Sequence, residues 1–346
     1  MNPYIMSVLL SSLSLGTMIT LSSNHWFLAW IGLELNTLAI IPLMSKMHHP
    51  RATEATTKYF LTQSMASALL LFATTLNAWF TGEWTIINMQ TSTPTIMLTI
   101  ALMIKLAVAP FHLWLPDVIQ GLNLMMCLVL LTWQKLAPLA LLIQINPEMN
   151  STFITLLGTL SLLIGGWGGL NQPHLRKIMA FSSIAHLGWM IIVMSYSPNL
   201  AQLNLLVYLL MTSSLFLTMM NLQTTNMNKM ASSWMKNFPL FSTMTIILMS
   251  LGGLPPMSGF LPKWMILEEL IKQNMIPLAT LAIASTLLSL FFYLRISYTT
   301  SLTTSPSPLN SKLMWRLKLN PNPTISLMII LSIMLLPISP SIIDLM

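Results

Sequence analysis

Four ionisable side chains, Glu34, Lys105, Lys135 and Lys263, interrupt long apolar stretches of this sequence. At the centre of a lipid bilayer a charge costs about 2.5–3.5 kcal/mol even on a lenient insertion scale. Such groups are therefore expected to face a protein interior or a wet cavity and to pair with one another. Burial disfavours the ammonium form of lysine, whereas a nearby carboxylate favours it. A buried lysine with a movable or shared carboxylate partner can therefore take up and release a proton.

Glu34 is the natural partner of Lys105, because it is the one acid in the middle of an apolar stretch. A purely structural buried ion pair is the alternative interpretation. That interpretation leaves three lysines sharing one glutamate. A series of titratable sites accounts for this ratio more simply, so the pattern favours proton transfer.

Two histidines are further candidates. His186 lies in the middle of an apolar stretch, with Ser182 and Ser183 one turn before it, and His112 lies in a proline-rich segment. Either residue could be hydrogen-bonded packing or a proton relay, because imidazole titrates near neutral pH. No GxGxxG or CxxC motif occurs and Cys127 is the one cysteine, so we expect this chain to bind no cofactor and no metal.

Glycine and proline interrupt two of the apolar stretches close to a buried lysine. Pro110 and Pro116 follow Lys105, while Lys263 is preceded by the residues Gly252, Gly253, Pro255 and Pro256. Proline removes a helix donor and clashes with the preceding turn. Unpaired backbone at membrane depth is tolerated only beside protein or water. The sequence thus predicts two discontinuous helices, at about 94–120 and 238–270.

The two interruptions resemble each other. Pro110 and Pro116 recur as Pro256 and Pro262, 146 residues later and five apolar stretches further on. An odd number of membrane crossings inverts the orientation, so the pattern predicts inverted-topology repeats. Paired broken helices in such repeats are typical of a transport site.

Composition indicates the solvent in which these elements fold. Of the 346 residues 55% are hydrophobic and only 7% are charged, whereas a soluble domain carries about 25% charged residues. The sequence predicts an all-α integral membrane protein, residues 1–346 forming a single polytopic domain. Eleven transmembrane helices are expected, near 3–22, 25–44, 57–80, 94–120, 123–145, 151–170, 174–195, 199–222, 238–270, 276–298 and 324–343.

The distribution of basic residues supports this number. With eleven helices, Lys272 is the one basic residue in the loops on the side opposite the N-terminus. The loops on the side of the N-terminus contain Lys46, Arg51, Lys58, Arg176, Lys177, Lys229, Lys236, Arg295, Lys312, Arg316 and Lys318. This asymmetry is what the positive-inside rule predicts. The basic residues form no patch with interleaved aromatic residues, so the net charge of +7 does not indicate nucleic-acid binding.

Four motifs resemble the antiporter-like subunits of respiratory complex I, the NADH:ubiquinone oxidoreductase. They are residues 50–63 (PRATEATTKYFLTQ), 131–138 (LTWQKLAP), 175–186 (LRKIMAFSSIAH) and 252–264 (GGLPPMSGFLPKW). The resemblance covers nearly the whole chain. It implies that Glu34 and Lys105 form the carboxylate–lysine pair, Lys135 the central link and Lys263 the terminal lysine. His186 would lie on the hydrophilic axis between them.

The resemblance also implies a setting. The chain would be a core membrane-arm subunit, beside other antiporter-like chains and membrane phospholipids, whose proton path is driven by quinone reduction elsewhere in the complex. That complex would use NADH, FMN, iron–sulfur clusters and ubiquinone. The chain would lie in the mitochondrial inner membrane, with its N-terminus in the matrix and its C-terminus in the intermembrane space. A stand-alone cation/proton antiporter and a structural assembly subunit are the alternatives.

Overall fold

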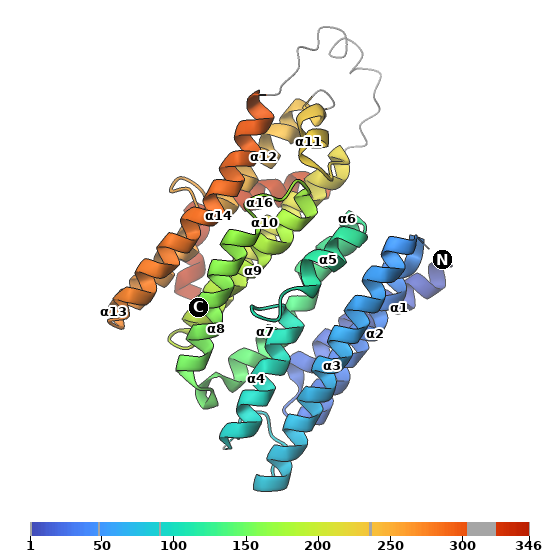
Figure 1. Cartoon of the computed structure of the whole chain (residues 1–346), viewed down its shortest axis with the longest axis vertical. Coiled ribbons are helices and arrows are strands. Elements are labelled where there is room, and N and C mark those ends of the chain that lie inside the picture. Colours follow the sequence, from blue (N-terminus) through green and yellow to red (C-terminus); the bar gives the residue numbers. More distant parts are fainter. Residues whose placement is uncertain (1, 48, 90, 235–236, 303–322, 346) are drawn as a thin grey trace. The chain divides into compact units, whose positions relative to one another are not determined.

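Helices make up most of the described fold (Figure 1). The computed structural model describes residues 2–47, 49–89, 91–234, 237–302 and 323–345. Within these ranges, eight helical segments are long and apolar enough to cross a membrane, and shorter apolar helices cover Ser92–Leu106, Phe238–Gly252 and Pro323–Ser339. Extended pairing in the same ranges is limited to two isolated bridges. The all-helical membrane class expected from the sequence is confirmed.

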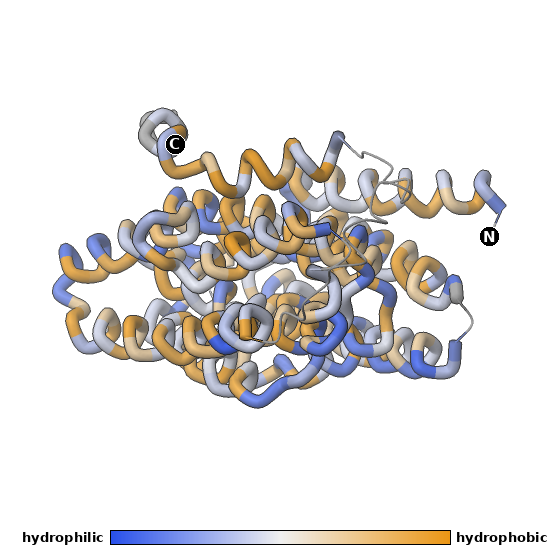
Figure 2. The backbone as a smooth tube through the Cα atoms, turned by 90° about the horizontal axis from the view of Figure 1, so that it is seen from above, coloured by the Kyte–Doolittle hydropathy of each residue, from blue (hydrophilic) through white to orange (hydrophobic). Residues whose placement is uncertain are grey.

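Hydrophobic residues are frequent along the helices, whereas many of the turns between helices are hydrophilic (Figure 2). Helix starts follow local capping rules. Asn2 caps α1 (Pro3–Ser22) by accepting from the Tyr4 amide, and His49 caps α3 (Pro50–Thr81) by accepting from the Arg51 amide. Both helices begin with proline, whose missing donor costs nothing in the first turn.

The chain divides into two compact units, Met1–Ser161 and Leu162–Met346. In the first unit α1 packs on α2 (Trp26–Met44), and α3 contacts α2, α4 (Ser92–Leu106) and α5 (Trp114–Gly121). After α6 (Leu124–Leu131) the chain continues as α7 (Trp133–Ile145), which contacts α1, α2 and α4. The helix α8 (Ser151–Gly168) begins in this unit and ends in the second.

In the second unit lies α9 (Leu175–Met194). Among the described helices that are long and apolar enough to cross a membrane, it has the largest buried share. It contacts α10 (Pro198–Leu222), α13 (Phe260–Lys272) and α14 (Ile276–Leu302). Three other helices complete the described part of this unit: α11 (Met227–Ser233), α12 (Phe238–Gly252) and α16 (Pro323–Leu345).

Helix bounds differ most from the expected ones at α3. The sequence predicts a span from residue 57, but the helix begins at Pro50. The first two turns carry Arg51 and Glu54, so hydropathy alone does not include them. The basic residues Lys236, Lys312, Arg316 and Lys318 used for the orientation lie outside the described residues.

The two units repeat the same sequence of elements around their broken helices. The bounds of α4 and α12 differ by 146 at both ends, and so do the first residues of α5 and α13. The residue after each first half, Ala107 or Gly253, has a left-handed backbone with φ of 61° or 82°. The internal repeat inferred from the prolines thus extends to the helix ends.

Hydrogen-bonded bridges repeat as well. In the first unit the Trp26 amide donates to Trp84 O at 3.1 Å, forming the bridge between His25 and Thr85. In the second unit the Leu175 amide donates to Thr225 O at 3.1 Å, forming the bridge between His174 and Asn226. Each bridge joins the start of a unit's second helix to the connection that follows its third.

Candidate functional site

The first half of the first broken helix, α4, ends one residue after Lys105. Ala107 adopts its left-handed conformation there, and the amides of Ala107 and Val108 donate to carbonyls of the last turn of α4. Trp114 Nε1, from the start of α5, donates to Ile104 O at 3.2 Å. These contacts satisfy helix-end carbonyls that would otherwise be unpaired. Pro110 lies within the non-helical segment, as predicted.

A small cavity lies beside this break. Lys105 and Lys135 both line it, and each is buried, with 7% and 5% of its surface exposed. Its volume is about 20 Å³, enough for about one water molecule. The polar residues Asn36, Thr37, Tyr59, Gln63 and Gln134 also line it. The structure therefore brings two of the predicted lysines to one polar site.

Glu34 lies near this site without bonding directly to Lys105. Its carboxylate is half-buried, accepts a hydrogen bond from Thr37 Oγ1 at 3.1 Å, and acts electrostatically on both Lys105 and Tyr59. Lys105 Nζ has no hydrogen-bond partner within the described part of the chain. Glu34 and Lys105 therefore interact through space, without an ion pair or hydrogen bond between them in the described part of the chain.

His112 lies inside the break itself. Its side chain is 8% exposed, and Nδ1 has no hydrogen-bond partner among the described residues. Its carbonyl accepts from the Leu115 amide at 3.1 Å, which starts the turn into α5. The ring does not line the cavity shared by Lys105 and Lys135.

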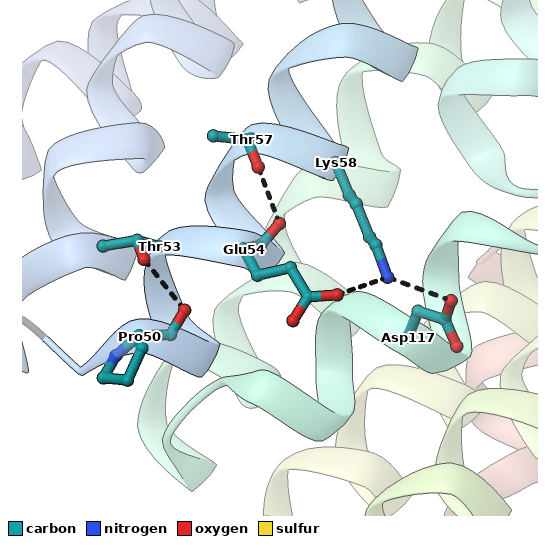
Figure 3. Close-up of polar contacts among 6 residues, drawn as sticks. All are labelled: Pro50, Thr53, Glu54, Thr57, Lys58 and Asp117. Carbon is teal, nitrogen blue, oxygen red and sulfur yellow. Dashed lines mark hydrogen bonds and ion pairs between the residues drawn. The ribbon is translucent and has the colours of Figure 1, made fainter.

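An exposed charge cluster joins α5 to the start of α3 (Figure 3). Lys58 Nζ lies 2.8 Å from Glu54 Oε1 on its own helix and 3.5 Å from Asp117 Oδ2 on α5. Solvent-exposed pairs of this kind contribute little energy. Closer packing supports the same contact, because a Cβ at Gly121 would lie 2.6 Å from Arg51 O.

The second broken helix uses its lysine differently. Lys263, on α13, reaches back so that its Nζ donates to Gly252 O at 2.9 Å and Leu251 O at 3.4 Å. These are carbonyls at the C-terminal end of α12, where a cation is favoured by the helix dipole. The lysine thus closes the end of one half-helix from the other.

Glycine is required at two positions of this break. Gly253 has φ of 82°, and a Cβ there would lie 2.9 Å from Lys263 Nζ. A Cβ at Gly259 would overlap the carbonyl oxygen of Ser250. Pro255 and Pro256 are exposed between these glycines. The predicted interruption is present, and its glycines make room for the lysine and for the returning chain.

A second cavity, of about 10 Å³, joins His186 and Lys263. Its polar lining also includes Ser182, Ser289 and Tyr293. The His186 ring lies 5.4 Å from that of Tyr208, between ring centroids. The structure therefore brings the predicted histidine and the predicted terminal lysine to one site in the second unit.

Sequence reasoning noted Ser182 one turn before His186, but it did not identify the other neutral polar residues of the two cavities. A signal was present in their spacing: Thr37 follows Glu34 by three residues, Ser182 precedes His186 by four, and Ser289 precedes Tyr293 by four. Such residues share a helix face. It also missed the interruption at Thr132 between α6 and α7, where the threonine hydroxyl donates to Leu128 O at 2.7 Å.

Comparison with known families gives two matches along the chain. The family model described as NADH:quinone oxidoreductase/Mrp antiporter, TM, matches residues 23–289. The model described as NADH dehydrogenase subunit 2 C-terminus matches residues 290–343. The titratable residues expected from the sequence (Glu34, Lys105, His112, Lys135, His186 and Lys263) lie within the first match, and Tyr293 lies within the second.

Similar proteins extend over the full length of the chain. NADH-ubiquinone oxidoreductase chain 2 of Tetraodon nigroviridis is 56% identical over 346 residues, covering 100% of this chain and 99% of the relative. The protein of that name from Xenopus laevis is 54% identical, covering 98% of this chain and 99% of the relative.

Solved structures share the fold. A chain of respiratory complex I from Thermus thermophilus with bound aureothin has a TM-score of 0.81 and 25% identity, covering 94% of this chain and 75% of that one. A chain of the Mrp complex from Dietzia sp. DQ12-45-1b has a TM-score of 0.77 and 20% identity, covering 87% of this chain and 61% of that one.

Proposed function

The chain belongs to the NADH:quinone oxidoreductase/Mrp antiporter membrane family, and we propose that its buried lysines move protons through the membrane. It is an antiporter-like subunit of the membrane arm of complex I. In this proposal Glu34, Lys105 and Lys135 handle protons in the first unit, and His186 and Lys263 in the second. His112 is a possible relay at the first break.

The observation that carries the proposal is the burial of three lysines beside small polar cavities. Lys105 and Lys135 share one such cavity and Lys263 lines the other. Keeping three amines at membrane depth is costly, and a merely structural role gives no reason for that cost. Quinone reduction elsewhere would shift the charge states of Glu34 and Lys105, and the later sites would respond.

We also propose eleven membrane crossings within a single polytopic domain, residues 1–346, built from inverted-topology repeats. The eight long apolar segments and three shorter ones among the described residues support this number, as does the 146-residue offset between the two broken helices. The N-terminus would face the mitochondrial matrix and the C-terminus the intermembrane space, in the inner membrane.

The chain would carry protons while other subunits carry electrons. Its sequence has one cysteine, whereas iron–sulfur clusters are held mainly by several thiolates. Iron–sulfur clusters would therefore be held elsewhere in the complex, and in this proposal NADH, FMN and ubiquinone are used elsewhere as well. The expected neighbours are other antiporter-like chains and membrane phospholipids.

A stand-alone cation/proton antiporter is the second candidate, because the matching family model also includes Mrp antiporters. Reconstitution of the isolated chain separates the two. Sodium-dependent proton flux would favour the antiporter, whereas proton movement only in the assembled, NADH-driven complex favours the subunit.

The direct test replaces Lys263 in the assembled complex. Lys263→Met should reduce the protons pumped per electron, because methionine keeps the volume of the side chain but holds no proton. Lys272→Met is the matched control, since Lys272 lies on the same helix, is 62% exposed and pairs with Glu268 at 3.0 Å. Proton release by reconstituted complex is the measurement. Unchanged stoichiometry in the Lys263 variant would remove this lysine from the path.

A further inference from the structure

A buried tyrosine hydroxyl lies at the cavity that His186 and Lys263 share. Tyr293, on α14, lines this cavity and is 1% exposed. Its Oη has no direct hydrogen-bond partner among the described residues. Ser182 lies close enough to interact with the hydroxyl, but the pair does not reach hydrogen-bond geometry. A buried phenol without a partner is costly, so its position calls for a reason.

Packing fixes this tyrosine beside the contact made by the terminal lysine. A Cβ on Gly252 would lie 3.5 Å from Tyr293 Cδ2, an ordinary van der Waals contact. The carbonyl of the same glycine accepts the Lys263 ammonium at 2.9 Å. Tyr293 and Lys263 therefore both lie against Gly252, the last residue of α12.

The cavity matches the needs of one bridging water. Its volume of about 10 Å³ is at the lower limit for a single water molecule. A buried water needs two to four polar partners, and the side chains of Ser182, His186, Lys263 and Tyr293 supply them from three helices.

We propose that Tyr293 is a further proton-relay residue of this site, whose hydroxyl links Lys263 to His186 directly or through one water. The proposal rests on the proton path put forward above. A proton leaving the Lys263 ammonium is taken by the phenol oxygen as the phenol's own proton passes to the His186 imidazole. Lysine becomes neutral, imidazole becomes cationic and Tyr293 stays neutral; the reverse transfer uses the same atoms.

Packing alone would not require the hydroxyl. The neighbouring Phe292 is equally buried and its ring lies 4.4 Å from that of Tyr293. Phenylalanine at residue 293 would keep the ring contacts and remove the unpaired polar atom. A structural role therefore predicts that the hydroxyl is dispensable, and a relay role predicts that it is not.

The test is Tyr293→Phe in the assembled complex, reconstituted into liposomes and driven by NADH. Tyr298→Phe is the control, because it removes a hydroxyl from a 64% exposed residue of the same helix. Tyr293→Phe is expected to lower proton-coupled turnover about threefold to tenfold, the cost of about one hydrogen bond in the transfer path. The ratio of rates in H₂O and D₂O should rise in this variant alone.

Unchanged turnover and an unchanged isotope ratio in Tyr293→Phe would overturn the relay. If Lys263→Met still impairs pumping in that case, the proposed function stands and only the relay fails; if neither variant has an effect, both fail. Should Tyr293→Phe not assemble, the unmodified complex provides a second measurement. An ordered water within hydrogen-bond distance of Tyr293 Oη, or a direct hydrogen bond between that oxygen and Lys263 or His186, supports the relay. A dry cavity with no such direct bond overturns it.

Discussion

At the scale of single residues, the buried lysines have different surroundings. Lys105 Nζ has no hydrogen-bond partner in the part of the chain that the structure describes, although Glu34 acts on it electrostatically. Lys263 Nζ donates to two helix-end carbonyls. Lys105 Nζ is therefore held by packing and electrostatics without a hydrogen bond to a described residue, whereas Lys263 Nζ is bonded to fixed backbone atoms. A lysine that must exchange hydrogen-bond partners during proton transfer is better suited by the surroundings of Lys105, where no bond has to be broken first.

Lys105→Met should stabilise the protein while impairing proton movement. Methionine fills a similar volume and removes an unpaired buried amine, which favours the folded state by about 1–3 kcal/mol. Thermal unfolding of the assembled complex measures the first effect and proton stoichiometry the second. A destabilised variant would contradict the view that Lys105 Nζ is buried without a hydrogen bond.

At the scale of elements, each functional unit is a helix broken beside a lysine. The gap of residues 107–113 places Lys105 in the last turn of a half-helix, and the gap of residues 253–259 lets Lys263 return to the preceding one. The left-handed residue after each first half turns the chain out of the helix. Ala107 carries a Cβ there, but Gly253 cannot do so without meeting Lys263.

Gly253→Ala should therefore displace Lys263, in addition to straining the backbone. Gly82→Ala is the matched control, because Gly82 also ends a helix, has φ of 76° and has open space around it. Alanine in the left-handed region costs about 1 kcal/mol at either position. Thermal unfolding should show this shared cost, and only Gly253→Ala should reduce protons pumped per electron. Equal pumping in the two variants would show that the position of Lys263 does not matter.

The sequence predicted these breaks because glycine and proline act locally. Pro110 and the run from Gly252 to Pro256 identified both gaps within a few residues. The backbone carbonyls to which Lys263 donates could not be predicted, because they depend on the direction of the side chain. The interruption at Thr132 was also missed, since neither glycine nor proline marks it and only its backbone, with φ of −109° and ψ of −72°, departs from the helix.

At the scale of the whole molecule, titratable groups are distributed over both compact units, and each unit has its own small polar cavity. Hydropathy and charge distribution were sufficient to predict the membrane class, and glycine and proline indicated the two broken helices. Neutral residues such as Thr37, Tyr59 and Tyr293 could not be assigned, because hydroxyls are frequent along membrane helices and only tertiary packing brings them to a cavity.

The most direct measurement is proton stoichiometry in assembled complex whose four buried charges are all neutralised, as Glu34→Gln, Lys105→Met, Lys135→Met and Lys263→Met. Neutral residues of similar volume avoid burying an unpaired charge, so assembly should persist. NADH oxidation by quinone should continue, with fewer protons pumped per electron than in unmodified complex. An unchanged number of protons per electron would contradict a proton path through this chain and would leave it a structural subunit.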